Sequence, residues 1–305
     1  MSSIGQTSIA EDQNARREKL LNEQKKRKRD FSEYAQELAL SQNTQDEDYE
    51  ATLSKKEKRK LDEEVTYESG TQDSAKRVRI KGPNPKNQQK NPYADQLMYA
   101  EWMIQVPPNL FGGWYLILCP KGKRCMIISA NGKTLCRSKS GRVIKNFQSA
   151  LPAGFANYRG NRSSDYCILD CIFDESTSTF FVLDLMCWKG MPLYDCATEF
   201  RFFWLQSKLT ELDPPRTSAQ TEFQFRSLQP FDCTQESLTS LASNPYQLSY
   251  QPDGLLFFNK EAHYEIGDTP LCGWVGIEKF EEIIGSWLSP QPTQSIEPGP
   301  ALMEQ

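Results

Sequence analysis

Short apolar runs separated by turn-forming residues dominate the chain after residue 90. Each run is rich in aromatic and branched side chains and is bounded by Gly, Pro, Asn or Ser, which is typical of β-strands. Because few long helical segments separate the runs, we expect an α+β fold with mostly antiparallel sheets rather than alternating strands and helices. The pattern predicts strands at 113–119, 124–130, 165–174, 179–188, 200–206 and 255–260.

Three other segments have the composition or the capping residues of helices. Residues 12–40 contain no Gly or Pro and are rich in strong helix formers. Residues 93–105 are interpreted as a second helix, which the Pro-Pro pair that follows would end. A third helix is expected at 234–242, with Thr234 as its N-cap.

The chain divides into two parts of different composition. The first 90 residues contain four aromatic side chains, no Trp and no Cys, whereas residues 91–305 contain 30 aromatics, all six Trp and all nine Cys. So few large apolar side chains cannot bury enough surface to offset the entropy of ordering. We therefore expect a disordered arm with a basic helix at 1–40, a disordered linker at 41–90, a folded core at 91–280 and a disordered tail at 281–305.

The helix of the arm carries a strong positive charge. Eight of the fourteen residues from 16 to 29 are basic and two are acidic, which gives a local charge of plus six (8 − 2). Its apolar stripe is too narrow for an independent fold, so we expect it to fold on a partner. A solvated coil or a nonspecific nucleic-acid tail is the alternative. The basic residues are Arg16, Arg17, Lys19, Lys25, Lys26, Arg27, Lys28 and Arg29.

Composition argues against several classes of protein and site. No apolar run reaches the roughly 18 to 20 residues of a membrane span, and the N-terminus lacks a secretory signal, so we expect a cytosolic or nuclear protein. The Cys residues form no CxxC pair, and Cys167, Cys171 and Cys187 lie in apolar runs, which favours buried reduced thiols over disulfides or zinc ligands. His263 is the only histidine, and no phosphate-binding glycine loop occurs. We expect no metal and no cofactor.

Three segments resemble, in order, motifs of the covalent nucleotidyltransferases, which include the mRNA capping guanylyltransferases and the nucleic-acid ligases. Residues 119–124 (CPKGKR) match the KxDGxR motif in its glycine and arginine. Residues 182–186 resemble the acidic strand of that family, and residues 253–257 (DGLLF) resemble the strand that follows it. The resemblance implies the capping-enzyme fold for the core.

The positions that would carry nucleotidyl transfer have changed. Cys119 stands in place of the nucleophilic lysine, Lys121 in place of the ribose-binding aspartate and Met186 in place of the metal-binding glutamate. Without an amine nucleophile or a carboxylate to hold magnesium, nucleotidyl transfer is hard to carry out. We therefore expect a nucleotide-binding fold without enzymatic activity.

A longer series of segments resembles the snurportin family, the import adaptors for trimethylguanosine-capped spliceosomal snRNPs. The resemblance covers nearly all of residues 91–276, in order, and the MCWKGMP and DGLLF blocks are its most specific parts. It implies a non-enzymatic adaptor that binds the cap of the snRNA, is linked to importin-β and shuttles between cytoplasm and nucleus. Further segments that carry it are 93–107, 164–173, 180–196, 200–209, 252–264 and 269–275.

The same resemblance implies a cap-binding site. Trp274 matches the ring on which the base stacks, and Trp102 matches the segment along the methylated edge of the base. Arg124 and Lys139 match basic positions near the triphosphate. The family has Leu and Ser where this chain has Tyr99 and Ala100. The expected site consists of Trp274, Trp102, Tyr99, Ala100, Cys119, Arg124, Lys139 and Ile172.

The basic arm resembles the importin-β-binding segment of the family, although the family's basic stretch ahead of its RR(x)KLL portion is missing. Ile4 and Ile9 could replace family leucines that contact an exportin used for recycling. Two other functions remain open from the residues themselves. One is an active, RNA guanylyltransferase-like nucleotidyltransferase, and the other is a general RNA-binding scaffold with an unrelated basic tail.

Overall fold

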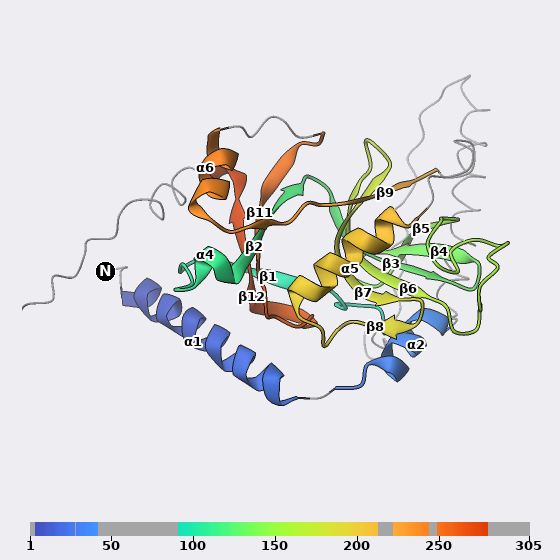
Figure 1. Ribbon diagram of the computed structural model, residues 1–305, viewed down its shortest axis with the longest axis horizontal. Helices are drawn as coiled ribbons and strands as arrows, with labels where there is room; N and C mark the ends of the chain where they lie inside the picture. The colour runs from blue at the N-terminus through green and yellow to red at the C-terminus, as the bar shows by residue number, and fades with distance from the viewer. Residues whose placement is uncertain (1–3, 28, 42–90, 213–221, 244–248, 280–305) are drawn as a thin grey trace, which may run out of the picture.

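A computed structural model gives the fold and describes residues 4–27, 29–41, 91–212, 222–243 and 249–279 (Figure 1). Side chains of the first helix are described from residue 13 onward. All but the first residue of the predicted linker (41–90), and the whole of the predicted tail (281–305), lie outside the described residues.

The first sheet contains five strands, in the order β1-β12-β11-β2-β10, and a 3₁₀ turn (Ile277–Lys279) follows its last strand along the chain. Its strands are β1 (Met98–Trp102), β2 (Trp114–Pro120), β10 (Phe231–Asp232), β11 (Pro252–Asn259) and β12 (Gly267–Gly276). β1 pairs with β12 in parallel, and the other neighbours are antiparallel. The sheet thus joins the start of the core to its end.

The second sheet contains seven strands. They are β3 (Lys123–Ala130), β4 (Lys133–Arg137), β5 (Val143–Phe147), β6 (Cys167–Asp174), β7 (Thr179–Trp188), β8 (Met191–Pro192) and β9 (Gln224–Ser227). The order is β5-β4-β3-β6-β7-β8, and β9 lies off this path and pairs in parallel with β7. The β3–β4 turn is formed by Asn131 and Gly132, both at positive φ, which suits a tight hairpin.

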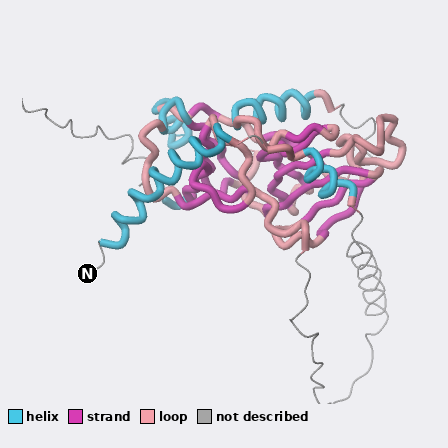
Figure 2. Tube along the Cα trace, turned by 90° about the horizontal axis from the view of Figure 1, so that it is seen from below, coloured by secondary structure: helices cyan, strands magenta, loops and turns pink. Residues whose placement is uncertain are grey.

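The two sheets share an apolar core, with helices on their outer sides (Figure 2). Ile117 of the first sheet and Leu183 of the second belong to this shared inter-sheet core. Leu205 packs on the other face of the second sheet, and Leu238 packs on the other face of the first. These outer helices are α4 (Leu110–Gly113), α5 (Thr198–Thr210) and α6 (Gln235–Ser243).

The predicted α+β architecture with mostly antiparallel strands is confirmed, but one predicted strand is wrong. Residues 200–206 belong to α5 and not to a strand. Thr198, Arg201, Phe202 and Leu205 are its buried residues, at the three- and four-residue spacing of a helix face. The aromatic content of this segment favoured a strand, but the spacing of its buried positions is helical.

The helix predicted at 93–105 is also wrong. Its middle forms β1, because residues 98–102 pair with residues 267–274 of β12. That partner lies about 170 residues further along the chain, so local helix propensity carried no information about it. The helix predicted from Thr234 is confirmed as α6: the amide of Ser237 donates to the Thr234 hydroxyl at 3.1 Å, which is an N-cap hydrogen bond.

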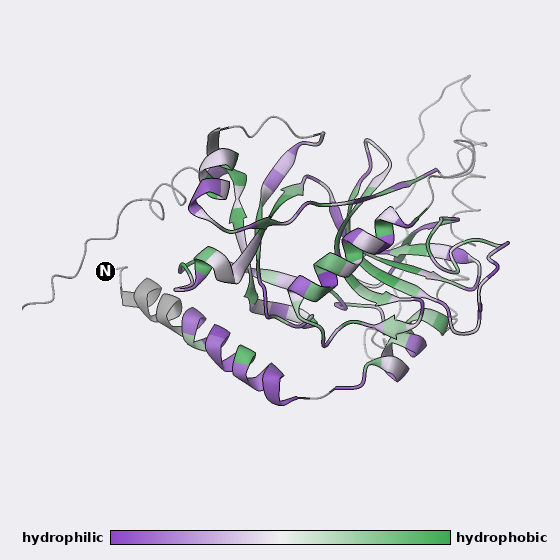
Figure 3. Cartoon of the chain, in the orientation of Figure 1, coloured by the Kyte–Doolittle hydropathy of each residue, from purple (hydrophilic) through white to green (hydrophobic). Residues whose placement is uncertain are grey.

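The basic arm contains two helices, α1 (Ile4–Lys26) and α2 (Ser32–Leu40), where the sequence predicted a single one over 12–40. Figure 3 shows that the described part of α1 is largely hydrophilic, whereas α2 is more apolar. Ala35, Leu38 and Ala39 of α2 are buried in the inter-sheet core. The described part of the arm therefore packs on the core, which its composition did not foretell.

All nine Cys residues are free thiols, and eight of them are buried, including Cys167, Cys171 and Cys187. The predicted burial is thus confirmed. Among the described residues, no helix combines the length and the apolar character that a membrane span requires.

A buried ion pair joins α5 to the second sheet. Arg201 donates from Nε and Nη2 to the two carboxylate oxygens of Asp184 on β7, at 2.9 and 2.8 Å, and both side chains are essentially inaccessible to solvent. Removing one partner of such a pair leaves an uncompensated buried charge, which costs about 3 to 5 kcal/mol.

We therefore expect Arg201→Met to lower the free energy of unfolding by about 3 to 5 kcal/mol, measured by urea denaturation. Lys123→Met is the control, because the Lys123–Glu175 pair is exposed on both sides and should contribute little. Equal effects of the two substitutions would contradict the assignment of a structural role to the buried pair.

Candidate functional site

Trp274 lies in β12, and its neighbours across the sheet come from distant parts of the chain. It is in register with Trp102 on β1 and with Leu256 on β11. It belongs to a ten-residue strand. Its side chain is partly buried and packs against the inter-sheet core, so part of the indole remains accessible.

Gly254 gives the Trp274 indole its position. A methyl group added at Gly254 would overlap Cζ2 of the indole and lie 2.7 Å from its Cη2. Gly254 is in register with Cys119 on β2, the next strand of the sheet. The indole therefore extends from β12 across β11 toward Cys119, and only a residue without a side chain allows this approach.

The second sheet contributes Arg124 and Ile172, which are in register on β3 and β6. Arg124 donates from Nε and Nη2 to the carboxylate of Asp170 at 2.5 and 2.7 Å, and from Nη2 to the carbonyl oxygen of Met98 at 3.0 Å. Among the described residues its Nη1 makes no hydrogen bond. The side chain is 23% exposed.

Asp170 keeps the Arg124 guanidinium positively charged. Burial alone would lower the pKa of this guanidinium, but the attraction and hydrogen bonds of the Asp170 carboxylate outweigh burial and raise it. The Tyr264 hydroxyl donates to the same carboxylate at 2.7 Å and accepts a hydrogen bond from the amide of Met98 at 3.0 Å. Asp170 therefore orients both a cation and the first residue of β1.

Tyr99 and Ala100 follow on β1 and are both partly buried against the inter-sheet core. The Nζ of Lys139, on the exposed β4–β5 turn, lies 4.0 Å from the centre of the Tyr99 ring, which is a cation–π contact. The Tyr99 hydroxyl is buried and has no hydrogen-bond partner among the described residues. Burial, with the nearby Asp170 charge, raises the pKa of Tyr99 to about 12, so the hydroxyl keeps its proton.

Cys119, which the motif resemblance aligns with a nucleophilic lysine, is chemically inert. Cys119 is 1% exposed, and burial raises the pKa of its thiol to about 12, so the thiolate needed for attack is not formed near neutral pH. Lys121 lies in the exposed β2–β3 turn, and Met186 is fully buried in β7. Within the described ranges, no cluster of three or more His, Cys, Asp or Glu side chains could hold a metal ion.

The structure brings most of the predicted cap residues together. Tyr99, Ala100, Cys119, Ile172 and Trp274 all belong to or pack against one inter-sheet core. The two cations stand beside them: Arg124 bonds to the strand that carries Tyr99, and Lys139 lies over the Tyr99 ring. Trp102 differs, because its side chain is 59% exposed and is in none of the apolar clusters, although its backbone pairs with Trp274.

Sequence reasoning missed three residues that position the site: Asp170, Gly254 and Tyr264. A carboxylate in the middle of the apolar run CILDCIF was a visible signal for Asp170, because a buried charge requires a partner. No local signal pointed to Tyr264, whose role depends on contacts with β1 and β6.

Residues 96–276 match the family model described as Snurportin1, m3G cap-binding domain. The chain belongs to this family. The match covers 181 of 305 residues (276 − 96 + 1) and spans both sheets and all eight predicted cap residues.

Several solved structures of DNA ligases are also similar, at a distance. A mycobacterial DNA ligase D complexed with ATP and MES matches at 16% identity and a TM-score of 0.40, covering 62% of each chain. The ligase domain of LigD from M. tuberculosis matches at 17% identity and a TM-score of 0.37, covering 62% of this chain and 60% of the other. The chain thus spans less than two thirds of the length of these two ligase chains, and no conclusion about function depends on them.

The residues that the snurportin resemblance assigns to importin-β fall into two groups. Arg16, Arg17, Lys25 and Arg29 contact the core. Lys19, Lys26 and Arg27 are exposed, and Arg27 pairs with Glu23 of its own helix. Lys28 lies outside the described residues, and the side chains of Ile4 and Ile9 are likewise not described.

We expect Tyr99→Phe to leave the free energy of unfolding unchanged or to raise it by about 1 kcal/mol, because the substitution removes a buried hydroxyl that has no partner. The matched control is Tyr264→Phe, which removes a hydroxyl with two partners and should cost about 1 to 3 kcal/mol. Urea denaturation measures both. A loss of stability in Tyr99→Phe similar to that in the control would contradict an unpartnered hydroxyl.

Proposed function

We propose that the protein is a non-enzymatic nuclear import adaptor, which binds the trimethylguanosine cap of spliceosomal snRNPs and links them to importin-β through its basic arm. The observation that carries the proposal is the match of residues 96–276 to the m3G cap-binding family. The gathering of Trp274, Cys119, Ile172 and two cations at one edge of the inter-sheet core supports it. Shuttling between cytoplasm and nucleus, with recycling by an exportin, belongs to the same proposal.

The chemistry of the cap fits an aromatic and apolar site. Its base is a cation, because N7 is methylated, and its exocyclic nitrogen is dimethylated and has lost both hydrogen-bond donors. What remains for recognition is a flat cationic ring with methyl groups, together with O6 and the N1–H group. Such a base is best read by stacking and apolar contact, and stacking on an aromatic side chain is worth about 1 to 3 kcal/mol. The positive charge of the base adds a cation–π attraction.

Trp274 is the residue we assign to this stacking. Its indole is fixed against Gly254 and is only partly buried, so it combines a rigid position with an accessible surface. A ring already held in place loses little conformational freedom on binding. The thiol of Cys119 and the side chain of Ile172 would then supply apolar contacts to the methyl groups.

Arg124 and Lys139 are assigned to the triphosphate of the cap. Arg124 keeps its Nη1 available while Asp170 fixes the rest of the guanidinium. Lys139 is exposed above the Tyr99 ring and can turn toward an anion. Charge-assisted hydrogen bonds of this type are about twice as strong as neutral ones.

Competition between cap analogues tests this function. Trimethylguanosine cap dinucleotide should bind more tightly than the monomethylated form, since the apolar contacts read the added methyl groups. Equal binding of the two caps would overturn the proposal. Equal binding of capped and uncapped RNA would support a general RNA-binding scaffold, and a covalent nucleotide after incubation with labelled GTP and magnesium would support an active nucleotidyltransferase.

We expect Trp274→Ala to weaken binding of the trimethylguanosine cap by about 1 to 3 kcal/mol, with the fold retained. Trp204→Ala is the control, because Trp204 is a partly buried indole on α5 that packs against a different apolar cluster. Fluorescence titration with the cap dinucleotide measures both. Unchanged affinity in Trp274→Ala would remove Trp274 from the site.

Charge reversal at Lys19, Lys26 and Arg27 is expected to weaken importin-β binding at least tenfold while leaving cap affinity unchanged. These three side chains are exposed and make no contact with the core, so the substitutions act on the arm alone. Pull-down and titration with importin-β, alongside cap titration, measure the two affinities. Loss of both would argue against separate binding modules.

A further inference from the structure

Four carboxylates of the core lie along the path of the basic arm. They belong to β1, to the β8–α5 loop and to the β11–β12 loop, and each forms an ion pair with the arm. We call this group of carboxylates the acidic docking surface. The pairs are Arg16–Glu101, Lys25–Glu261, Arg29–Asp195 and Arg29–Glu265.

The first clamp is at the end of β1. Arg16 donates to both carboxylate oxygens of Glu101, at 2.6 and 2.8 Å, in the bidentate geometry that Arg and carboxylates favour. The side-chain amide of Gln13 donates to Glu101 at 3.1 Å and to the carbonyl oxygen of Trp102 at 3.0 Å. Gln13 is 1% exposed, so this contact excludes water.

Arg17 is enclosed by the core next to this clamp. It is 4% exposed and donates to the carbonyl oxygens of Pro270 and Gln105, at 3.1 and 3.0 Å. Its guanidinium lies 5.6 Å from the centre of the Trp114 ring. Burial lowers the pKa of Arg17 to about 10, which still leaves it charged at neutral pH. A charged side chain this deeply buried is held by the core and cannot reach another protein from there.

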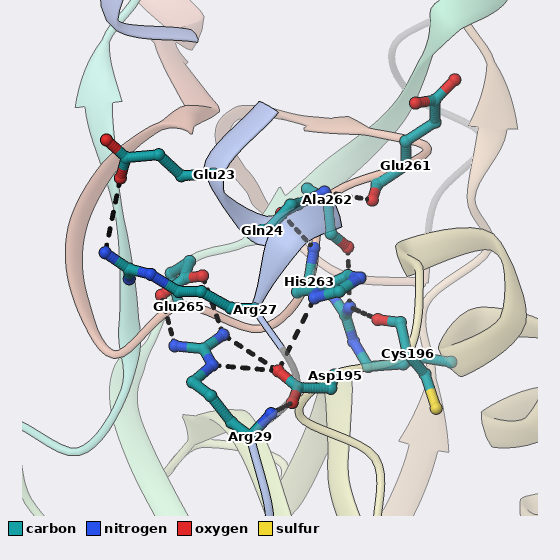
Figure 4. A network of polar contacts seen from close by, with 11 residues as sticks. Glu23, Gln24, Arg27, Arg29, Asp195, Cys196, Glu261, Ala262, His263 and Glu265 are labelled. Carbon is teal, nitrogen blue, oxygen red and sulfur yellow. Dashed lines mark hydrogen bonds and ion pairs between the residues drawn. The ribbon is translucent and has the colours of Figure 1, made fainter. Parts of the chain in front are cut away.

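The second clamp is centred on Arg29 (Figure 4). Its Nε donates to Asp195 at 3.1 Å, and its two terminal nitrogens donate to Glu265 at 3.1 and 2.9 Å. Its backbone amide donates to the other oxygen of Asp195 at 3.0 Å. Immediately after it, Phe31 stacks on Tyr194 with ring centres 4.5 Å apart. Charge, backbone and apolar contacts thus fix the same short segment.

Gln24 lies between Arg16 and Arg29 along the arm and contacts the backbone of the β11–β12 loop. Its side-chain amide donates to the carbonyl oxygen of Glu261 at 2.7 Å and accepts from the backbone amide of His263 at 3.0 Å, as Figure 4 shows. The side chain is 3% exposed. Gln13, Arg16, Arg17, Gln24 and Arg29 thus all make polar contacts with the core.

We propose that the acidic docking surface is a receptor for the chain's own basic arm, and that importin-β must compete with it for the same side chains. The inference rests on the proposed importin-β link, because Arg16, Arg17, Lys25 and Arg29 belong to both sets of contacts. Lys19, Lys26 and Arg27 are exposed while the arm is docked, and Arg27 pairs only within its own helix, so all three are accessible for a first encounter with the receptor. Full binding requires the arm to leave the core.

The competition has a definite thermodynamic consequence. The apparent dissociation constant for importin-β equals the intrinsic one divided by the fraction of molecules whose arm is released. Weakening the docking surface raises that fraction without changing the arm itself. Substitutions of these core carboxylates, which leave every residue assigned to importin-β unchanged, should therefore tighten importin-β binding.

Asp195→Asn combined with Glu265→Gln in the full-length chain tests the inference. Amide hydrogen exchange reports on docking, and titration with importin-β reports on competition. In the unsubstituted protein we expect residues 13–41 to be protected. In the double variant we expect faster exchange over residues 24–41 and importin-β affinity about tenfold higher, with cap affinity unchanged.

Glu175→Gln is the matched control, since it removes a carboxylate that pairs only with Lys123 on the β6–β7 side of the core. It should leave both exchange and importin-β affinity unchanged. Glu101→Gln is a second, independent variant, which should raise exchange mainly over residues 13–17. It keeps the test valid if the double variant is poorly folded.

Two results would overturn the inference. Exchange of residues 13–41 at the rate of an unstructured peptide in the unsubstituted protein would show that the arm is not docked. Faster exchange in the double variant without a gain in importin-β affinity would show that docking does not compete. Absence of importin-β binding in every variant would overturn the competition together with the proposed link, and intact exchange protection would then locate the failure in the proposed function rather than in docking.

Discussion

The candidate site depends on one buried carboxylate. Asp170 on β6 accepts hydrogen bonds from Arg124 on β3 and from Tyr264 in the β11–β12 loop. The Tyr264 hydroxyl also accepts a hydrogen bond from the backbone amide of Met98 at the start of β1. A buried charge with this many partners is costly to disturb, because each partner removed leaves the carboxylate less compensated. The two sheets, the arginine and the strand that carries Tyr99 are therefore held in one arrangement.

Around that carboxylate, the site combines an aromatic ring in a fixed position with unreactive buried side chains. The Trp274 indole is positioned by the missing side chain of Gly254, and Cys119 stands beside it as a protonated thiol. The buried thiol of Cys119 and the buried side chain of Met186 offer apolar contact area. Such a site is suited to hold a methylated base and not to react with it.

The basic arm docks on the core through its polar side chains. Its arginines and glutamines meet carboxylates and carbonyls of the core with good geometry, so a helix that is too polar to fold alone is ordered by packing in cis. The features that make it a suitable ligand for an acidic receptor also make it a ligand for the acidic docking surface. Its availability to a partner then depends on the balance between the two surfaces.

Much of this was readable from the sequence, because it is local. Short apolar runs bounded by turn formers identified β2, β3, β6, β7 and β11, and the Asn-Gly turn and the Thr234 cap were visible. The eight cap residues that the family resemblance implies stay a prediction. Tertiary structure alone decided that residues 98–102 form a strand and that the arm docks on the core. Both depend on partners distant in the sequence, and pairing free energy from such partners outweighs the local propensity that a linear pattern records.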